Sequence, residues 1–153
     1  MCGIAGVFHG QAPQDVERML EKISHRGPDG RGVKNLPVGT LGHTRLAIID
    51  VEGGHQPMGF EDTWIVFNGE IYNYRELARE HLKDLPLKTH SDTEVIVQLY
   101  RKYGPSAVKL LDGMFAFALW DKATQSLTLG RDRLGEKPLY YGWQGQGNDA
   151  VFL

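Results

Sequence analysis

The protein has 153 residues, of which 41% are hydrophobic and 24% charged, and its formal net charge is −2 at pH 7. This length fits one domain with a sizeable core, and the small, dispersed charge offers no electrostatic footprint for nucleic acid or an anionic membrane. No apolar run approaches the roughly 18 residues of a membrane helix, and the N-terminus lacks the features of a signal peptide. The single cysteine excludes an internal disulfide, and no group of cysteines and histidines has zinc-ligand spacing, so we expect no metal. We therefore expect a cytoplasmic protein that binds neither nucleic acid nor membrane.

The first part of the chain is predicted to form a strand, a helix and a turn-rich loop. Residues 2–8 are a short apolar run that contains two glycines, which predicts a buried strand. A helix is predicted to open at Pro13. Its apolar face is formed by residues at helical spacing, namely Val16, Met19, Leu20 and Ile23. Residues 26–30 (RGPDG) then form a rigid loop.

The middle of the chain is predicted to hold two strands and two loops. Residues 39–50 are interpreted as a strand with a loop at its centre, and residues 53–57 as a second loop. Residues 64–67 are predicted to form a strand that stops abruptly at Asn68-Gly69. On its own, an Asn-Gly dipeptide is typical of a hairpin turn.

Two longer helices are predicted to follow. Asn73 is the expected cap of the first helix, and its inward side chains are expected to be Tyr74, Leu77, Ala78 and Leu82. Residues 91–94 (SDTE) fit a capping box for the second helix, and Gly104-Pro105 is expected to end it. The apolar residues that repeat along this helix are Ile96, Leu99, Tyr100 and Tyr103. A short helix is expected over residues 107–111.

The C-terminal part is rich in predicted strands. Residues 114–120 are almost wholly apolar, as in a strand that is covered on both faces. Further strands are predicted over residues 127–131, 139–143 and 150–153, and residues 142–147 resemble a hairpin turn. Helices clustered between groups of strands indicate an α+β protein with helices packed on sheets, not alternating βαβ units.

Cys2 directly follows the initiator methionine, whose removal is expected because the second residue is small. The processed residue would carry a thiol and a free α-amine. A thiol is mostly protonated at neutral pH, and the amine can take its proton, directly or through a water, without any histidine. On its position alone, Cys2 is more readily interpreted as a small buried hydrophobe at the start of a strand.

Glutamine, as a candidate substrate, makes demands that three further positions can meet. Its α-carboxylate needs a forked donor such as Arg45, and its α-ammonium needs a carboxylate such as Asp92. The tetrahedral oxyanion needs two preorganised N–H donors, which Asn68-Gly69 offers. Each position has a plainer alternative: a salt bridge from Arg45 to Asp50 or another acid, a helix-terminal charge for Asp92, and a turn at Asn68-Gly69.

Taken together, these motifs resemble those of the class II glutamine amidotransferase domain. The segments that carry the resemblance run in order through essentially the whole chain and are residues 2–6, 25–30, 43–50, 68–73, 91–94, 112–117, 131–133, 135 and 137–140. The HRGPDG and NGEIYN motifs resemble the glutamine-hydrolysing asparagine synthetase branch more than the glucosamine-phosphate synthase or purine amidotransferase branches. The resemblance implies a four-layer αββα sandwich, in which two antiparallel sheets are flanked by helices, of the N-terminal-nucleophile hydrolase type.

The same resemblance implies roles for individual residues. Cys2 is the expected nucleophile, and Asn68 with the N–H of Gly69 is the expected oxyanion hole. The expected substrate-binding residues are Arg45 for the α-carboxylate, Leu46, Ala47, Ile48 and Ile49 for the adjoining pocket wall, and Asn68, Gly69, Glu70 and Asp92. Arg26 and Asp29 also match the family's motif, but a buried ion pair that holds the loop over the site explains these two residues equally well.

The resemblance also implies a reaction and its partners. Glutamine would be hydrolysed to glutamate through a thioester on Cys2, and the ammonia would pass to a synthetase domain or subunit, most readily one that makes asparagine from aspartate. No cofactor is expected for this domain, since ATP and Mg²⁺ would belong to a synthetase domain whose phosphate-binding loop the sequence lacks. We expect residues 1–153 to be a glutaminase domain that is C-terminally incomplete, and a homodimer is one possible assembly.

Two alternatives stay open from the sequence. The first is a catalytically inactive module that is kept for a binding or assembly role. The second is an N-terminal-nucleophile amidase that acts on another amide, against which the candidate charges for a free amino acid, Arg45 and Asp92, argue.

Overall fold

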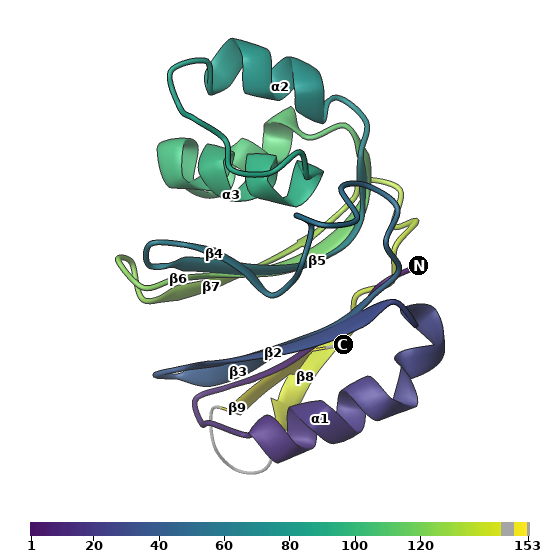
Figure 1. Ribbon diagram of the computed structural model, residues 1–153. Helices are drawn as coiled ribbons and strands as arrows, with labels where there is room; N and C mark the ends of the chain where they lie inside the picture. The colour runs from purple at the N-terminus through teal and green to yellow at the C-terminus, as the bar shows by residue number, and fades with distance from the viewer. Residues whose placement is uncertain (145–148, 153) are drawn as a thin grey trace.

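The structure is a computed structural model that describes residues 1–144 and 149–152. Two antiparallel β-sheets are stacked on each other, and helices cover both outer faces, so the layers follow the order helix, sheet, sheet, helix (Figure 1). The first strands and the last two strands of the chain share one sheet, and the strands between them form the other. This confirms the predicted α+β sandwich.

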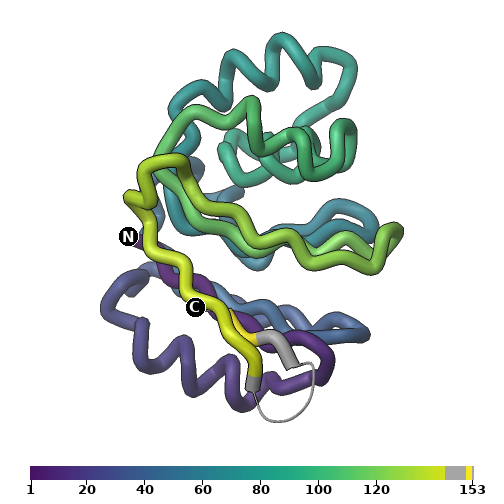
Figure 2. The backbone as a smooth tube through the Cα atoms, turned by 180° about the vertical axis from the view of Figure 1, so that it is seen from behind, coloured from purple at the N-terminus to yellow at the C-terminus, as the bar shows by residue number. Residues whose placement is uncertain are grey.

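The first sheet has five strands in the order β2-β3-β1-β9-β8. Their bounds are Gly30–Leu36 for β2, Gly39–Arg45 for β3, Gly3–Phe8 for β1, Asp149–Phe152 for β9 and Tyr141–Gln144 for β8. The central strand β1 pairs with β3 on one side and with β9 on the other, which places the two ends of the chain in one sheet (Figure 2). Gly3 lies opposite Thr44, so Cys2 stands beside the end of β3.

Helix α1 (Pro13–Lys22) covers the outer face of the first sheet, as its apolar spacing predicts (Figure 1). Val16 and Leu20 are fully buried. A Cβ at Gly42 of β3 would lie 2.5 Å from Cγ1 of Val16, so glycine there lets the helix approach the sheet closely. A short 3₁₀ helix, η1 (Ser24–Arg26), then leads into the loop beside the N-terminus.

The second sheet has four strands in the order β4-β5-β6-β7. Their bounds are Met58–Phe60 for β4, Thr63–Ile71 for β5, Gly113–Asp121 for β6 and Ser126–Arg131 for β7. Helices α2 (Tyr74–His81) and α3 (Asp92–Tyr103) cover its outer face. A 3₁₀ helix, η2 (Gly104–Leu110), follows α3 where a short helix is predicted.

Strand β6 is buried on both faces, as its apolar run predicts. Its side chains alternate between the cluster under the helices (Phe115, Phe117 and Leu119) and the cluster between the two sheets (Ala116, Ala118 and Trp120). Because the period of a strand is two, one strand can join both layers of core. This central packing fixes β5, the neighbour of β6, on which part of the site is built.

The extent of β5 corrects a prediction. The strand does not stop at Asn68-Gly69 but continues to Ile71. Asn68 pairs with Ala116 and Gly69 with Phe115, so the Asn-Gly dipeptide lies inside a ladder and is not a hairpin turn. The local turn preference of the dipeptide is overridden by pairing with a fully buried neighbour strand.

Other boundaries also differ from the predictions. Strand β3 ends at Arg45, and the second half of the predicted 39–50 strand is a loop. Strands β2 and β4 are missing from the predictions, because β2 contains two glycines and two basic residues and β4 has only three residues. Leu153, the last residue of the predicted 150–153 strand, and residues 145–148 of the predicted turn lie outside the described residues.

The start of α3 is only partly as predicted. Ser91 caps the helix, and its side chain accepts a hydrogen bond from the N–H two residues on, at 3.2 Å. Glu94 does not complete a capping box with Ser91. Its carboxylate instead accepts from the backbone N–H groups of Lys88 and Thr89 at 2.9 and 2.6 Å, and so organises the turn before the helix.

Candidate active site

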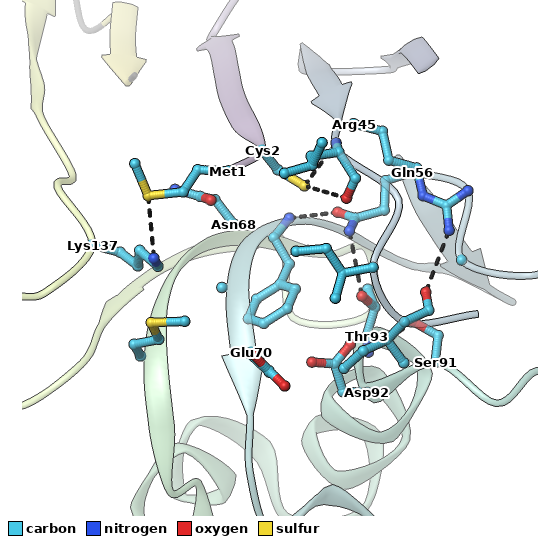
Figure 3. Close-up of a pocket in the computed structure, with 17 residues that line it drawn as sticks. Met1, Cys2, Arg45, Gln56, Asn68, Glu70, Ser91, Asp92, Thr93 and Lys137 are labelled. Carbon is cyan, nitrogen blue, oxygen red and sulfur yellow. Dashed lines mark hydrogen bonds between the residues drawn. The ribbon is translucent and has the colours of Figure 1, made fainter. Parts of the chain in front are cut away.

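The predicted site residues come together around one cavity, at the end of the sandwich where the starts of β1 and α3 approach β3 and β5 (Figure 3). The cavity is lined by Met1, Cys2, Arg45, Leu46, Ile48, Ile49, Gly54, Gln56, Phe67, Asn68, Gly69, Glu70, Ser91, Asp92, Thr93, Met114 and Lys137. Of the predicted residues, only Ala47 is not part of this lining. Ile48 is 69% exposed and forms an open rim, not a buried wall.

The side chain and the carbonyl of Cys2 are both held by hydrogen bonds. The backbone N–H of Leu46 donates to the sulfur at 3.4 Å, and the thiol donates to the carbonyl of Leu46 at 3.6 Å. The Nε of Arg26 donates to the Cys2 carbonyl at 3.0 Å. These bonds fix the position of the sulfur at the cavity.

The loop of residues 26–30 fastens Cys2 to the segment after β3. The N–H of Asp29 donates to the carbonyl of Arg45, and the Asp29 carboxylate accepts from the N–H of Ala47, both at 2.9 Å. A Cβ at Gly27 would lie 2.4 Å from the backbone nitrogen of Arg45, so this close approach requires glycine. The alternative of an ion pair between Arg26 and Asp29 is wrong for the described residues, since each side chain binds backbone groups.

Strand β5 presents an open edge to the cavity. The N–H of Phe67 donates to Oε1 of Gln56 at 2.6 Å, and the N–H of Ile71 donates to the carboxylate of Asp92 at 3.0 Å. In an antiparallel strand, alternate residues direct their N–H groups to the same edge. The N–H of Gly69, midway between these two, therefore points to the edge that faces the cavity.

Glycine at position 69 meets a packing requirement as well. A Cβ there would lie 2.1 Å from the carbonyl oxygen of Met114 and 2.7 Å from Cα of Phe115. Any other residue would push β5 away from β6. The same absence of a side chain leaves the Gly69 N–H accessible from the cavity.

The side chain of Asn68 is available for a ligand. The residue is only 4% exposed, and it lines the cavity together with Cys2. Within residues 1–144 and 149–152, its amide forms no hydrogen bond with another protein group. Its N–H groups are therefore free to donate to an oxyanion in the cavity.

Two side chains that the sequence analysis does not single out support β5 at this point. His43 of β3 lies between the sheets and binds the carbonyl of Phe67 at 3.1 Å through Nε2, which must carry the proton because a carbonyl only accepts. Burial lowers the pKa of His43 to about 4, nearby Arg45 adds to this, and the Phe67 carbonyl opposes it. Gln56, besides binding the Phe67 N–H, donates to Oγ1 of Thr93 at 3.3 Å. At the open edge of β5, the neutral His43 and Gln56 thus supply the hydrogen bonds to Phe67 that a neighbouring strand would otherwise make.

Arg45 is 6% exposed at the end of β3, and its guanidinium holds the following loop. Nη1 donates to the carbonyl of Val51 at 2.7 Å, and Nη2 donates to the carbonyls of Asp50 and Ile49 at 2.5 and 3.4 Å. A Cβ at Gly54 would lie 2.5 Å from Nη2.

The salt-bridge alternative for Arg45 is wrong for the described part of the chain. None of the ion pairs there includes Arg45. The Asp50 carboxylate instead accepts from the N–H groups of Gly53 and His90 at 2.9 and 2.7 Å. The guanidinium of Arg45 therefore forms no ion pair with an acid of the described residues, and it lines the cavity.

Two acids occupy the other side of the cavity. Asp92 is 4% exposed, and burial raises its pKa to about 6, with a further rise from the nearby charge of Glu70. The N–H groups of Ile71 and Thr93 oppose this rise. No ion pair within the described residues includes Glu70 or Asp92. A buried Asp92 beside a half-buried Glu70, with no cation paired to either among the described residues, is a site that a ligand ammonium would stabilise.

Met1 and Lys137 are further lining residues that the sequence analysis did not assign to the site. Met1 lies between Cys2 and Lys137, and Nζ of Lys137 contacts its sulfur at 3.3 Å (Figure 3). Lys137 belongs to a matched sequence segment, which was the one signal that could have pointed to it. Its burial at the cavity comes from contacts that are far apart in the sequence.

The residues that the structure describes contain neither a metal-binding cluster nor a membrane-spanning helix. No three histidine, cysteine, aspartate or glutamate side chains there form a group that could hold a metal ion. None of the helices there has the length and apolar character required to cross a membrane.

Stacked antiparallel sheets, helical outer layers and a cysteine beside an open strand edge at the N-terminus are typical of the N-terminal-nucleophile hydrolases. A family model described as a glutamine amidotransferase domain matches residues 1–152. The chain belongs to this family.

Known relatives point to one branch of the family. The chain is 46% identical over 92% of its length to the glutamine-hydrolyzing asparagine synthetase 1 of Bacillus subtilis. It is 44% identical over 97% of its length to the glutamine-hydrolyzing asparagine synthetase 2 of Oryza sativa subsp. japonica. It is 43% identical, also over 97% of its length, to the glutamine-hydrolyzing asparagine synthetase 3 of Arabidopsis thaliana. The matches cover 24%, 26% and 27% of these relatives, so the chain spans about a quarter of their length.

Proposed function

We propose that this chain hydrolyses the side-chain amide of free glutamine through a thioester on Cys2, once Met1 has been removed. The observation that carries the proposal is the cavity itself. It places one thiol, one open strand-edge N–H and unpaired charges of both signs around a common space. A free amino acid with a side-chain amide matches this set of groups.

In the first half of the proposed reaction, the α-amine of processed Cys2 takes the thiol proton, and the sulfur attacks the side-chain carbonyl carbon. The carbonyl oxygen becomes an oxyanion that accepts hydrogen bonds from the Asn68 amide and the Gly69 N–H. The intermediate collapses, the C–N bond breaks, and the α-ammonium returns its proton to the leaving nitrogen. Ammonia departs and a glutamyl thioester remains on Cys2.

In the second half, water replaces ammonia. The α-amine takes a proton from the water as it attacks the thioester, and the same two donors hold the second oxyanion. The C–S bond then breaks, glutamate leaves and the thiol is restored. The thiol, the amine and the two N–H donors therefore serve both half-reactions.

The charges select the amino-acid end of the substrate. Arg45 is proposed to bind the α-carboxylate, since a guanidinium offers forked donors and three backbone bonds already hold it in place. Glu70 and Asp92 are proposed to bind the α-ammonium. Leu46 and Ile49 are proposed to line the wall along the aliphatic part of the substrate, with Ile48 at the rim.

The test compares processed wild-type protein with Cys2→Ala and Cys2→Ser, after intact mass has shown that Met1 is absent. We expect equal release of ammonia and glutamate by the wild type, and a loss of at least about 10³-fold in both variants. Glutamine binding should survive in Cys2→Ala, which separates lost chemistry from lost folding. Equal turnover by wild type and Cys2→Ala would refute the proposal, and retained Met1 without turnover would favour an inactive binding module.

We further propose that the ammonia serves asparagine synthesis from aspartate in a synthetase domain or subunit. The names of the relatives support this acceptor, and ATP and Mg²⁺ are proposed to act in the synthetase and not in this domain. Mixing the processed chain with an asparagine synthetase whose own N-terminal cysteine has been replaced tests the idea. Label from amide-¹⁵N glutamine should appear in the asparagine side chain, and label that stays wholly in free ammonia would contradict it.

A further inference from the structure

The loop between β7 and β8 is built around one carboxylate. Asp132 accepts hydrogen bonds from four backbone N–H groups, those of Phe115, Leu134, Glu136 and Lys137, at 2.8–3.1 Å. Burial opposes ionisation of this carboxyl, but the backbone donors prevail and lower its pKa to about 2. Asp132 therefore stays ionised near neutral pH, and its bonds fix the course of the loop.

Arg131 holds the same loop by its carbonyl groups. Its Nε donates to the carbonyl of Lys137 at 2.7 Å, and its Nη2 donates to the carbonyl of Gly135 at 2.6 Å. Gly135 has φ +69°, which favours glycine. Both backbone groups of Lys137 are thus fixed by charged side chains, and the proposed reaction has given none of these residues a task.

The result of this construction is a buried lysine that faces the N-terminus. Lys137 is 6% exposed and lines the cavity with Cys2. Its Nζ contacts the sulfur of Met1 at 3.3 Å, a weak acceptor. No carboxylate within the described residues forms an ion pair with it. A buried ammonium without an acid partner is costly, so its retention here indicates a task.

We propose, resting on the function proposed above, that Lys137 is a positioning residue that keeps the α-amine of processed Cys2 in its neutral, proton-accepting form. Removal of Met1 takes away the thioether and leaves the new amine at the same end of the cavity as the ammonium. A cation nearby disfavours a second cation. Lys137 acts through the amine and not on the substrate.

The other charges around this end of the cavity do not keep the α-amine neutral in the way proposed for Lys137. They are Arg26, Arg45, Glu70, Asp92, Asp132 and Glu136. The two cavity acids favour the protonated amine, and Glu136 and Asp132, on the loop of Lys137 itself, have the same sign. The guanidinium of Arg45 is held on the carbonyls of residues 49–51, where the proposed substrate carboxylate would neutralise its charge, and that of Arg26 is held on the Cys2 carbonyl. Lys137 is the cation whose charged atom has only a thioether as partner in the described structure, and it offsets the acids.

The size of the effect follows from the ordinary behaviour of an N-terminal amine. Such an amine, with a pKa of about 7.7–8.0, is mostly protonated at pH 7 and is then no base. One nearby charge shifts the pKa of such an amine by about one unit or more. We therefore expect the neutral fraction at pH 7 to fall several-fold when Lys137 loses its charge.

The first measurement is the pH dependence of kcat/KM for glutamine in processed Lys137→Met, Lys137→Arg and Lys83→Met. Methionine matches lysine in length without its charge, and Lys83 is an exposed control. We expect the acidic limb to move to higher pH by about one unit in Lys137→Met, with the plateau at high pH kept within a few-fold. Arginine at 137 and methionine at 83 should leave the limb in place. A loss that is equal at every pH, as packing alone would give, would overturn the proposal.

The second measurement does not require glutaminase activity. In processed Cys2→Ala protein, the ¹³Cβ shift of the substituted N-terminal residue reports protonation of its amine. The amine should titrate about one unit higher when Lys137→Met is added, but not when Lys83→Met is added. An unchanged titration in a folded variant, as judged by its circular dichroism, would overturn the inference. If Lys137→Met does not fold, Lys137→Gln replaces it in the same comparison.

The two measurements separate two failures. A shifted titration of the N-terminal amine in a chain without any glutaminase activity would reject the proposed function and leave the electrostatic role of Lys137 intact. Glutaminase activity with an unshifted titration of the amine would reject the role of Lys137 and leave the proposed function intact.

Discussion

The two ends of the cavity are held by different kinds of interaction. At the nucleophile end, the groups proposed to react or to hold the oxyanion are neutral: Cys2 is held by hydrogen bonds with Leu46, and Asn68 and Gly69 by their pairing with β6. The cations Arg26 and Lys137 lie beside them. At the amino-acid end, which comprises Arg45, Glu70 and Asp92, full charges are buried or half-buried without ion-pair partners in the described structure.

The difference matches what each end is proposed to do. A transition-state oxyanion gains most from donors that are already fixed, because they need no reorganisation during the reaction. A zwitterionic amino acid brings its own charges, so the protein must leave opposite charges free to meet them. Substitutions at the nucleophile end should therefore change kcat, and those at the amino-acid end should change KM.

The largest effect among the supporting residues is expected at Asn68. Asn68→Ala removes one of the two proposed oxyanion donors, and kcat should fall about 10²–10³-fold with KM changed only a few-fold. Steady-state glutamine hydrolysis by processed protein measures both constants. Asn68→Asp, which keeps the shape but replaces a donor with an acceptor, should be at least as poor.

The comparison between the ends would be broken if Asn68→Ala raised KM and left kcat intact. That outcome would place Asn68 at the binding end. Thermal unfolding of the variant supplies the control, because Asn68 lies in the middle of β5 and its loss could loosen the strand.

Substitution of Arg45 should give the next largest effect, and this effect should fall on KM instead of kcat. Arg45→Lys keeps the charge but loses the fork, so KM for glutamine should rise on the order of tenfold or more while kcat changes less. The carbonyls of residues 49–51 would also lose donors, so some loss of thermal stability is expected. An N-acetyl glutamine control separates the ends, since its carboxylate still needs Arg45 whereas its blocked amine no longer needs Asp92.

Much of the fold was predictable because its signals are local and periodic. The apolar spacing of α1 and the continuous apolar run of β6 gave their position and their burial. The continuation of β5 through Asn68-Gly69 was not predictable in the same way. It depends on pairing with β6, more than 40 residues away in the chain, and that partner outweighs the local turn preference.

The site shows the same division. Cys2, Arg45 and Asp92 could be proposed from chemistry and from the matched motifs. Three further residues could not be placed, because their roles depend on contacts between distant segments. Gln56 binds an N–H at the edge of β5, His43 binds a carbonyl of the opposite sheet, and Lys137 contacts the N-terminal residue. The alternative roles for Arg26 and Asp29 failed for a related reason, since the sequence does not show that each side chain binds backbone.

The smallest predicted effect is a pH dependence that belongs to Asp92 alone. Its pKa is raised to about 6, so the folded protein without ligand keeps this proton where an unfolded chain would lose it. A raised acid pKa means that the stability contribution falls as pH rises from about 4 to about 6 and is level above that. A bound α-ammonium reverses the preference, because it stabilises the ionised carboxylate.

Glutamine binding to Cys2→Ala protein should therefore weaken about tenfold between pH 7 and pH 5, as a single group of pKa about 6 requires. Isothermal titration calorimetry across this range measures it. Adding Asp92→Asn keeps an acceptor for the Ile71 N–H but removes the charge, so affinity should be lower and the slope in this window should flatten. The unfolding free energy of the same variant should also lose its decline between pH 4 and pH 6. An unchanged slope in Asp92→Asn would show that Asp92 is not the group whose ionisation controls binding of the substrate ammonium.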